Sequence, residues 1–493
     1  MKKIKYIMLI LSLAASSSCK KNIETTPISV ITSSSFFKTP DDVAGALRGM
    51  YVDFRTTAAN DMFWLGEGRS EVLTGAVAGA QGFDKFWNNT LSASAPNADN
   101  QVNFWKNLYA PINSANLMLK YVPDITFPSA DTKNSALAQA YTMRAFCYFV
   151  LVRAWGGVPI RTEPLEAYDA STINKPRSSV AEVFALIKSD LTKALSLYPN
   201  ITYEAGRNTW SKASADALKA DVYLWTAKML NGGQADLTTA LAAVNEAQTS
   251  DVGLLPVYSD IFSYTNKGNK EDLMVVRFQL NEGLQNYWQT MYISNLTNVS
   301  AATLAVVGAQ GVGNTGVNTA QVSKLVRDQF TTDDQRRNGT FFEIYDNANK
   351  YITSIVTKGS GMVNAGTRNF FTDVVIYRYA DLLLMKAEIK NALSQDPTTE
   401  MNLVRQRAYG TNFAAHIFVS GSPAANDDAI LKERLLELCT EGKRWWDLIR
   451  FGQAFNLVPS LAGKSGTPGL LLWPIGLTIR ATEPLVTEND AWK

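Results

Sequence analysis

The sequence predicts a mostly α-helical protein: tetratricopeptide-like helical hairpins in an α-solenoid-like core, with long loops and a few short strands. One observation behind this prediction is that a long helical pattern is followed three times by a loop and a shorter helical pattern. A second is that alanine recurs at helical spacing between large side chains, as at Ala213, Ala217 and Ala220. Small residues on a buried stripe let two helix backbones approach closely, as stacked hairpins require. The three pairs are residues 133–156 with 179–198, 211–230 with 236–248, and 377–393 with 398–409.

The composition excludes several classes of protein. A chain of 493 residues, 46% of them hydrophobic, can bury a large core. A net charge of +2 gives no electrostatic sign of nucleic-acid binding. The single histidine, His416, argues against multi-histidine zinc sites and Ser-His-Asp triads. Cys147 and Cys439 fall in apolar helical patterns without CxxC spacing, so we expect buried free thiols.

The N-terminus has the pattern of a secretory signal. "MKKIKYIMLILSLAASSSCKKN" combines a basic start, an apolar run too short to span a bilayer and small residues before Cys19. Its cysteine resembles the lipid-modified residue of a bacterial lipoprotein, although Ser16 departs from the usual box; the alternative is an ordinary signal peptide. We expect a signal peptide at 1–18, an acylated Cys19 that anchors the protein to a membrane, a tether at 19–35, and a single domain at 36–493.

Helix signals follow in order along this domain. Pro40 opens an amphipathic pattern over 40–55. The pattern over 102–122 requires a kink or a turn at Pro111. A long apolar helix ends at Gly156, before Pro159. "EDLMVVRFQL" and "KYITSIV" have the composition of strands.

Three long stretches show no helical pattern, at about 57–103, 251–370 and 453–493. Loops this long are uncommon in a compact domain and are usually functional when they occur. We therefore expect the ligand surface in these loop-rich insertions.

Two adjacent tryptophans lie inside a charged run, "KERLLELCTEGKRWWDLIRFG", residues 432–452. We predict one continuous helix here, with charges paired as Lys443–Asp447 and Glu441–Arg444. A glycine inside a helix is destabilising by roughly 0.5–1 kcal/mol relative to alanine, so Gly442 indicates a close approach of another element. This pattern favours a packing role for the tryptophans over display to a ligand. The predicted stripe consists of Leu435, Leu438, Gly442, Trp445 and Ile449.

The same stretch closely resembles the C-terminal signature of the SusD/RagB family of bacterial outer-membrane lipoproteins. Other stretches resemble the family's motifs in the same order, and "LWPIG" stands where the family has a Pro-Ile-Pro segment. The remaining matches are "WKNLYAPINSAN" (105–116), "RAFCYFVLVRAWGGVPI" (144–160), "KASADALKADVYLW" (212–225), "YRYADLLLMKAEIKNAL" (377–393) and "LVRQRA" (403–408).

The resemblance implies a lipid-anchored protein on four tetratricopeptide-like hairpins, with an irregular part that carries the ligand surface. Such proteins bind a nutrient, generally a glycan, without covalent chemistry and act as a lid on a SusC-type TonB-dependent outer-membrane transporter. The family's motifs mark its scaffold, so they identify no ligand contact. No cofactor or metal site is predicted, and no EF-hand-like loop is present.

Sugar rings stack on aromatic side chains while their hydroxyls bind polar ones, and two loop stretches offer this combination. Each of their rings has an alternative role, which is to anchor its loop on the core. A third stretch offers Trp64 with Asp61 and Arg69. The candidates are Phe86 and Trp87 beside Asn88, Asn89 and Asn100, and Tyr287, Trp288 and Tyr292 beside Asn281, Gln285 and Asn286.

Three other functions remain open at this point. A peptide could replace the glycan as the nutrient. A glycoside hydrolase needs two carboxylates roughly 5–9.5 Å apart, which 45 acidic residues do not exclude. A helical-repeat scaffold could bind only proteins.

Overall fold

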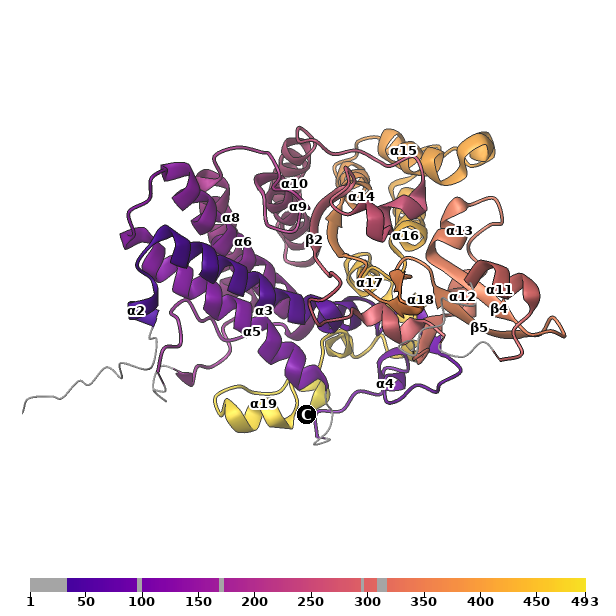
Figure 1. Cartoon of the computed structure of the whole chain (residues 1–493), viewed down its shortest axis with the longest axis horizontal. Coiled ribbons are helices and arrows are strands. Elements are labelled where there is room, and N and C mark those ends of the chain that lie inside the picture. Colours follow the sequence, from indigo (N-terminus) through magenta and orange to yellow (C-terminus); the bar gives the residue numbers. More distant parts are fainter. Residues whose placement is uncertain (1–32, 95–99, 168–172, 294–296, 308–316) are drawn as a thin grey trace, which may run out of the picture.

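A computed structural model describes residues 33–94, 100–167, 173–293, 297–307 and 317–493 (Figure 1). The predicted signal peptide at 1–18 and the lipidation site Cys19 lie outside these residues, as does nearly all of the predicted tether. The tether's last residues, 33–35, belong to a short helix, α2 (Ser33–Phe36). In the described part of the chain, no helix is long and apolar enough to cross a membrane.

Helices form most of the structure, and side-chain caps at their first turns explain where several begin. Thr39 and Asp42 form a capping box before Pro40, as do Ser179 and Glu182 at a later helix. The main helices are α3 (Pro40–Glu67), α5 (Asn100–Tyr121), α6 (Ala130–Trp155), α8 (Val180–Leu197), α9 (Lys212–Met229), α10 (Gly233–Ala247), α14 (Tyr379–Ala392), α15 (Thr398–Tyr409), α16 (Pro423–Leu438) and α17 (Arg444–Arg450).

The helices pack as hairpins, which confirms the predicted fold class. α3 packs on α5, α6 on α8, α9 on α10, and α14 on α15. Figure 1 shows the first hairpins side by side at one end of the molecule, followed by α9 and α10 and then the later helices. The alanines of α9 at positions 213, 217 and 220 are all fully buried, so they lie at the closely packed faces as predicted.

The strands are short and form two-stranded antiparallel pairs in the loop-rich part of the chain. Both stretches with strand composition contain a strand, namely β2 and β5. The pairs are β1 (Leu73–Gly75) with β3 (Ala320–Val322), β2 (Asp272–Val276) with β8 (Val374–Arg378), β4 (Phe341–Tyr345) with β5 (Tyr351–Val356), and β6 (Met362–Asn364) with β7 (Thr367–Asn369).

Two boundaries differ from the prediction. α3 runs on to Glu67, so the loop expected from residue 57 begins about three helical turns later. α5 begins at Asn100 and continues through Pro111, where a kink or a turn was expected; no turn begins there. In both cases packing against neighbouring helices overrides the local sequence signal.

The segment with the tryptophan pair is two helices, so the predicted continuous helix over 432–452 is wrong. α16 ends at Leu438 and α17 begins at Arg444. Between them the chain turns through left-handed backbone at Thr440 and at Gly442, whose φ is +72°. Gly442 is therefore required by the turn, because glycine adopts this conformation without a steric penalty.

The predicted charge pairs within this segment are also wrong. Lys443, Glu441 and Arg444 reach distant elements instead, and Asp447 pairs with Arg434 of α16 and Arg450 of its own helix, each at 2.9 Å. The ion pairs found are Lys443 with Asp381 (3.1 Å), Glu441 with Lys358 (2.6 Å) and Arg378 (2.9 Å), and Arg444 with Glu71 (2.6 Å).

The C-terminal end of α3 holds this turn in place. A Cβ atom on Gly66 would lie 1.9 Å from the carbonyl oxygen of Gly442, so the two backbones touch there. The Glu67 carboxylate accepts backbone N–H groups of Thr440 (2.8 Å), Lys443 (3.1 Å) and Arg444 (3.3 Å). Burial raises the pKa of Glu67 to about 7, although these N–H groups oppose the rise.

Arg69 extends the contact to the C-terminal loop. Its guanidinium lies 4.5 Å from the ring centroid of Trp445 and donates to the carbonyl oxygens of Leu470, Leu471 and Leu472. We call residues 66–71 together with residues 439–446 the lock. Every one of the lock's charged residues except Lys443 is buried.

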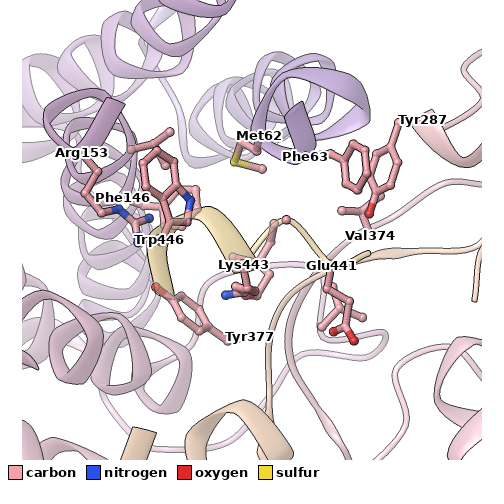
Figure 2. A pocket seen from close by; sticks show the side chains of 14 residues that line it. Met62, Phe63, Phe146, Arg153, Tyr287, Val374, Tyr377, Glu441, Lys443 and Trp446 are labelled. Carbon is pink, nitrogen blue, oxygen red and sulfur yellow. The ribbon is translucent and has the colours of Figure 1, made fainter. Parts of the chain in front are cut away.

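The tryptophan pair is packed inside the lock, as predicted. Trp445 is fully buried and Trp446 is 4% exposed. Figure 2 shows Trp446 beside Arg153, and Phe63 facing Tyr287, around a cavity next to the turn. Its volume is about 40 Å³. A water molecule needs about 10–15 Å³ by the same kind of measure, so this cavity admits a few waters and no sugar ring.

Candidate ligand-binding surface

Most of the predicted sugar-stacking rings are buried, so the structure corrects these assignments. A ring that stacks on a sugar must show one face to solvent, and five of the candidates do not. Their exposed fractions are 0% for Trp64 and Phe86, 4% for Tyr287, 1% for Trp288 and 3% for Tyr292.

The stretch at 281–292 anchors its loop on the core. Tyr287 stacks on Phe63 of α3 with ring centroids 4.0 Å apart, and its hydroxyl donates to the carbonyl oxygen of Thr440. Trp288 covers Gly359, where a Cβ atom would lie 1.9 Å from the indole. The neighbouring amides are also committed to the fold: Asn286 donates to the carbonyl oxygen of Thr372 at 2.6 Å.

Trp64 and Phe86 belong to an aromatic cluster under the lock. Trp64 lies 5.6 Å from Phe86, and Phe86 lies 5.3 Å from Trp473, centroid to centroid. Asn89 is buried and accepts from the Nε of Arg69 at 2.7 Å. Asp61 is likewise buried and accepts from Asn107 at 2.6 Å.

Trp87 and Asn88 keep the exposure that recognition requires. Trp87 ends a four-residue helix, α4 (Asp84–Trp87), and is half-buried, while Asn88 is exposed. Of the chain's 11 tryptophans, Trp87 and Trp492 are the two that are not buried. Buried Phe86 holds α4 on the core, so Trp87 lies on a fixed support.

The strand pair β1–β3 places polar groups next to Trp87. The Cβ position of Gly75, at the end of β1, lies 3.9 Å from the Trp87 indole. The side chain of Gln321, on β3, donates to the carbonyl oxygen of Gly75 at 2.7 Å. The oxygen of the same amide accepts a hydrogen bond from the hydroxyl of Tyr351 on β5.

Tyr351 connects this group to a second ring and to charged side chains. Tyr345 lies edge-on to Tyr351 at 5.9 Å, and the Arg327 guanidinium lies 4.7 Å from the Tyr351 ring centroid. Glu343 accepts from Arg327 (3.0 Å) and from the Tyr345 hydroxyl (3.2 Å). Burial raises the pKa of both phenols, so both stay protonated donors at neutral pH.

We call Trp87, Asn88, Gln321, Tyr345 and Tyr351 the Trp87 surface. Its three rings are half-buried, and amide, hydroxyl and carboxylate groups lie between or beside them. This arrangement suits a sugar, whose C–H faces need rings and whose hydroxyls need polar partners. Sequence reasoning missed Gln321, Tyr345 and Tyr351. The available signal was the two-residue strand period, which places Glu343 and Tyr345 on one face of β4.

A second opening lies between α5, the helix α19 (Leu477–Thr482) and the side chains of Arg161, Glu163, Leu165 and Ile173. Its volume is about 460 Å³. Its polar groups are largely paired with one another: Glu483 accepts from Arg161 at 2.9 Å and from the Trp105 indole at 3.2 Å. Trp105 is 2% exposed, so this opening offers a sugar no bare indole face.

Two models of protein families match the chain. One, described as "Starch-binding associating with outer membrane", matches residues 42–224. The other, described as the SusD family, matches residues 346–464. Together they include most helical hairpins and the C-terminal half of the lock.

Individual proteins agree with these matches over nearly the whole chain. SusD-like protein P38 of Formosa agariphila is 27% identical, with 99% of each chain covered. The structure of B. fragilis NanU superposes with a TM-score of 0.83 at 29% identity, covering 95% of this chain and 99% of that one. A laminarin-binding SusD-like protein shares the fold, with a TM-score of 0.74 at 21% identity over 92% of this chain and 100% of that one.

Proposed function

The chain belongs to the SusD family, and from this premise we propose that it binds a glycan nutrient at the cell surface through the Trp87 surface. The observation that carries the proposal is the set of three half-buried rings with hydrogen-bonding side chains between them. A relative with the same fold is described as laminarin-binding, which is compatible with a saccharide ligand. In this proposal the surface only recognises the glycan and performs no covalent chemistry on it, so the glycan is released unchanged.

The proposal includes delivery of the glycan to a SusC-type TonB-dependent transporter in the outer membrane. The description of a matching family as associated with the outer membrane supports this location. Cys19 carries the lipid that anchors the protein there. The tether that follows it leaves the folded body free to face the cell exterior and to cover the transporter.

Titration calorimetry with a panel of neutral polysaccharides and a panel of peptides tests the binding proposal. We expect heat from at least one polysaccharide and a loss of roughly tenfold or more in affinity for Trp87→Ala, because one sugar-stacking ring contributes about 1–3 kcal/mol, as for a stacked base. Trp492→Ala is the matched control, since it removes the other half-buried indole, and we expect it to leave the affinity unchanged.

Three results contradict the proposal. Binding of peptides with no heat from any polysaccharide makes this a peptide-uptake protein. Release of reducing ends from a bound glycan makes it a hydrolase. An equal loss of affinity in Trp87→Ala and Trp492→Ala removes the Trp87 surface from recognition.

A further inference from the structure

A pocket of about 460 Å³ lies between α3 and the end of β2, on the opposite half of α3 from the lock. Arg48, Tyr51, Val52 and Arg55 line it at helical spacing, so they form one face of α3. Arg277, just after β2, lines the other side. Ligand pockets usually measure about 300–1,000 Å³, so the space suits a small ligand.

Guanidinium groups outnumber carboxylates in this pocket. Its lining contains Arg48, Arg55 and Arg277 against Glu204 and Glu282. Glu282 accepts from Arg55 at 2.6 Å and also from Arg277, so one carboxylate serves two cations. Within the part of the chain that the structure describes, Arg48 has no carboxylate within ion-pair distance.

Arg48 and Arg277 are exposed to solvent, and within the described residues their one ion pair is that of Arg277 with Glu282. The Nε of Arg55 is buried without a hydrogen-bond partner, although only 17% of that side chain is exposed. Buried Arg378 gives the contrast, because it reaches Glu271, Glu437 and Glu441. A guanidinium has five donors in a planar fork that matches a carboxylate or a sulfate, so this pocket has donors available for an anion.

Glu282 occupies the position that such an anion would take. It stands in a surface turn between Asn281 and Gly283, both of which have left-handed backbone. Burial raises the pKa of Glu282, but Arg277 and Arg55 outweigh burial and the pKa is lowered, so the group is ionised at neutral pH. The Glu282 side chain is 28% exposed, so a ligand can replace its carboxylate without opening the core.

We propose that this α3–β2 pocket binds the carboxylate or sulfate group of an acidic sugar through Arg48, Arg55 and Arg277, with Glu282 as an internal competitor. The pocket is distinct from the Trp87 surface. None of the residues that line the pocket belongs to the Trp87 surface. The inference goes beyond the proposed function, because a neutral glycan could bind at the Trp87 surface without it.

Calorimetry with D-glucuronate, D-glucose 6-sulfate and D-glucose tests the pocket on the purified chain at low salt. We expect the acids to bind more tightly than glucose and to lose affinity as salt is raised. Arg48→Gln should weaken the acids by about tenfold, the equivalent of one charge-assisted hydrogen bond. Glu282→Gln should strengthen them by up to about fivefold, the equivalent of the exposed ion pairs it removes.

Lys193→Gln is the matched control, because it removes one exposed positive charge from α8. We expect this variant to bind the acids as the wild type does. Acids that bind no better than glucose overturn the proposal, as do equal losses in Arg48→Gln and Lys193→Gln. Binding of only the carboxylate or only the sulfate supports the pocket and identifies the group. Trp87→Ala should leave the affinity for the acids unchanged, so failure here is separable from failure at the Trp87 surface.

Discussion

The lock and the Trp87 surface use the same kinds of side chain for opposite purposes. In the lock, Arg69 lies against Trp445, and Glu71 pairs with Arg444 away from solvent. In the Trp87 surface, Arg327 lies against the half-buried ring of Tyr351. Glu343 accepts hydrogen bonds from Arg327 and from the Tyr345 hydroxyl. Composition therefore does not separate packing from recognition; the accessibility of the ring faces does.

The two regions also differ in how tightly their elements pack. In the lock, the backbones of Gly66 and Gly442 are in contact, and the cavity beside them measures only about 40 Å³. In the Trp87 surface, α4 carries Trp87, and short strands carry Gln321, Tyr345 and Tyr351, with polar groups between or beside the rings. Substitutions in the lock should therefore affect stability, and substitutions in the Trp87 surface should affect binding.

The largest expected effect is that of Trp445→Ala. Removal of a fully buried indole creates a cavity and should lower the free energy of unfolding by about 3–5 kcal/mol. Trp87→Ala should lower it by only about 1–2 kcal/mol, because that ring is half-buried. Urea unfolding followed by circular dichroism measures both values. Equal losses of stability would remove the distinction between the two regions.

Gly66→Ala should have the next largest effect. It should lower the free energy of unfolding by about 3 kcal/mol, near the upper end for overpacking. The added Cβ atom would lie 1.9 Å from a backbone oxygen, which cannot rotate away. Gly49→Ala on the same helix is the control: no atom lies within 4 Å of its Cβ position. That variant should gain about 0.4–1 kcal/mol. A neutral Gly66→Ala would show that the backbones do not touch.

Asp216 is a buried carboxylate outside the lock, and its protonation should make stability depend on pH. Burial raises its pKa to about 7, and its Oδ2 has no hydrogen-bond partner. Because the folded pKa exceeds the unfolded value of 3.8, the folded protein retains a proton in that interval. The contribution of Asp216 to the free energy of unfolding should therefore fall as pH rises from about 4 to 7, by up to about 4 kcal/mol, and then level off.

Asp216→Asn should remove this part of the pH dependence. Unfolding free energies of the two proteins, measured between pH 4 and 8.5, give the difference. As pH rises, the free energy of unfolding of Asp216→Asn should increase relative to that of the wild type. Parallel curves would mean that Asp216 titrates normally in the folded state.

Tyr351→Phe should have the smallest effect. The change removes one hydrogen bond to Gln321, which is worth about 0.5–1.5 kcal/mol. Glycan affinity should fall several-fold, because the change removes a hydroxyl of the Trp87 surface and one of the hydrogen bonds that hold the Gln321 amide. Tyr203→Phe removes a comparable bond to Ser250 and should leave affinity unchanged. A loss of affinity in both variants would point to a general loosening of the fold.

The helices were predictable because their signals are local. Pro40 opens α3, and alanines at helical spacing mark the buried face of α9. The end of α3 was not predictable, because Gly66 and Glu67 are fixed by contact with Gly442 and its neighbours. For the same reason the turn at Gly442 appeared in the sequence as a helix interior.

The candidate site was predictable only in part. Trp87 and Asn88 stood out as an aromatic residue and an amide in a polar loop. Trp288 stood in an equally polar loop, yet it is buried because Gly359 leaves room for the indole. Tyr351 joins Trp87 only through the pairing of β1 with β3, which a single sequence does not show.

The hydrogen bond from the Thr440 backbone to Glu67 joins residues 373 positions apart. Contacts between such distant segments form late, since a long loop must close before they stabilise anything. A nascent chain can therefore complete its first hairpins while the buried charges at the end of α3 still lack their partners. Synthesis must reach the last tenth or so of the polypeptide before these charges are neutralised, so a prematurely terminated product should stay open to proteases.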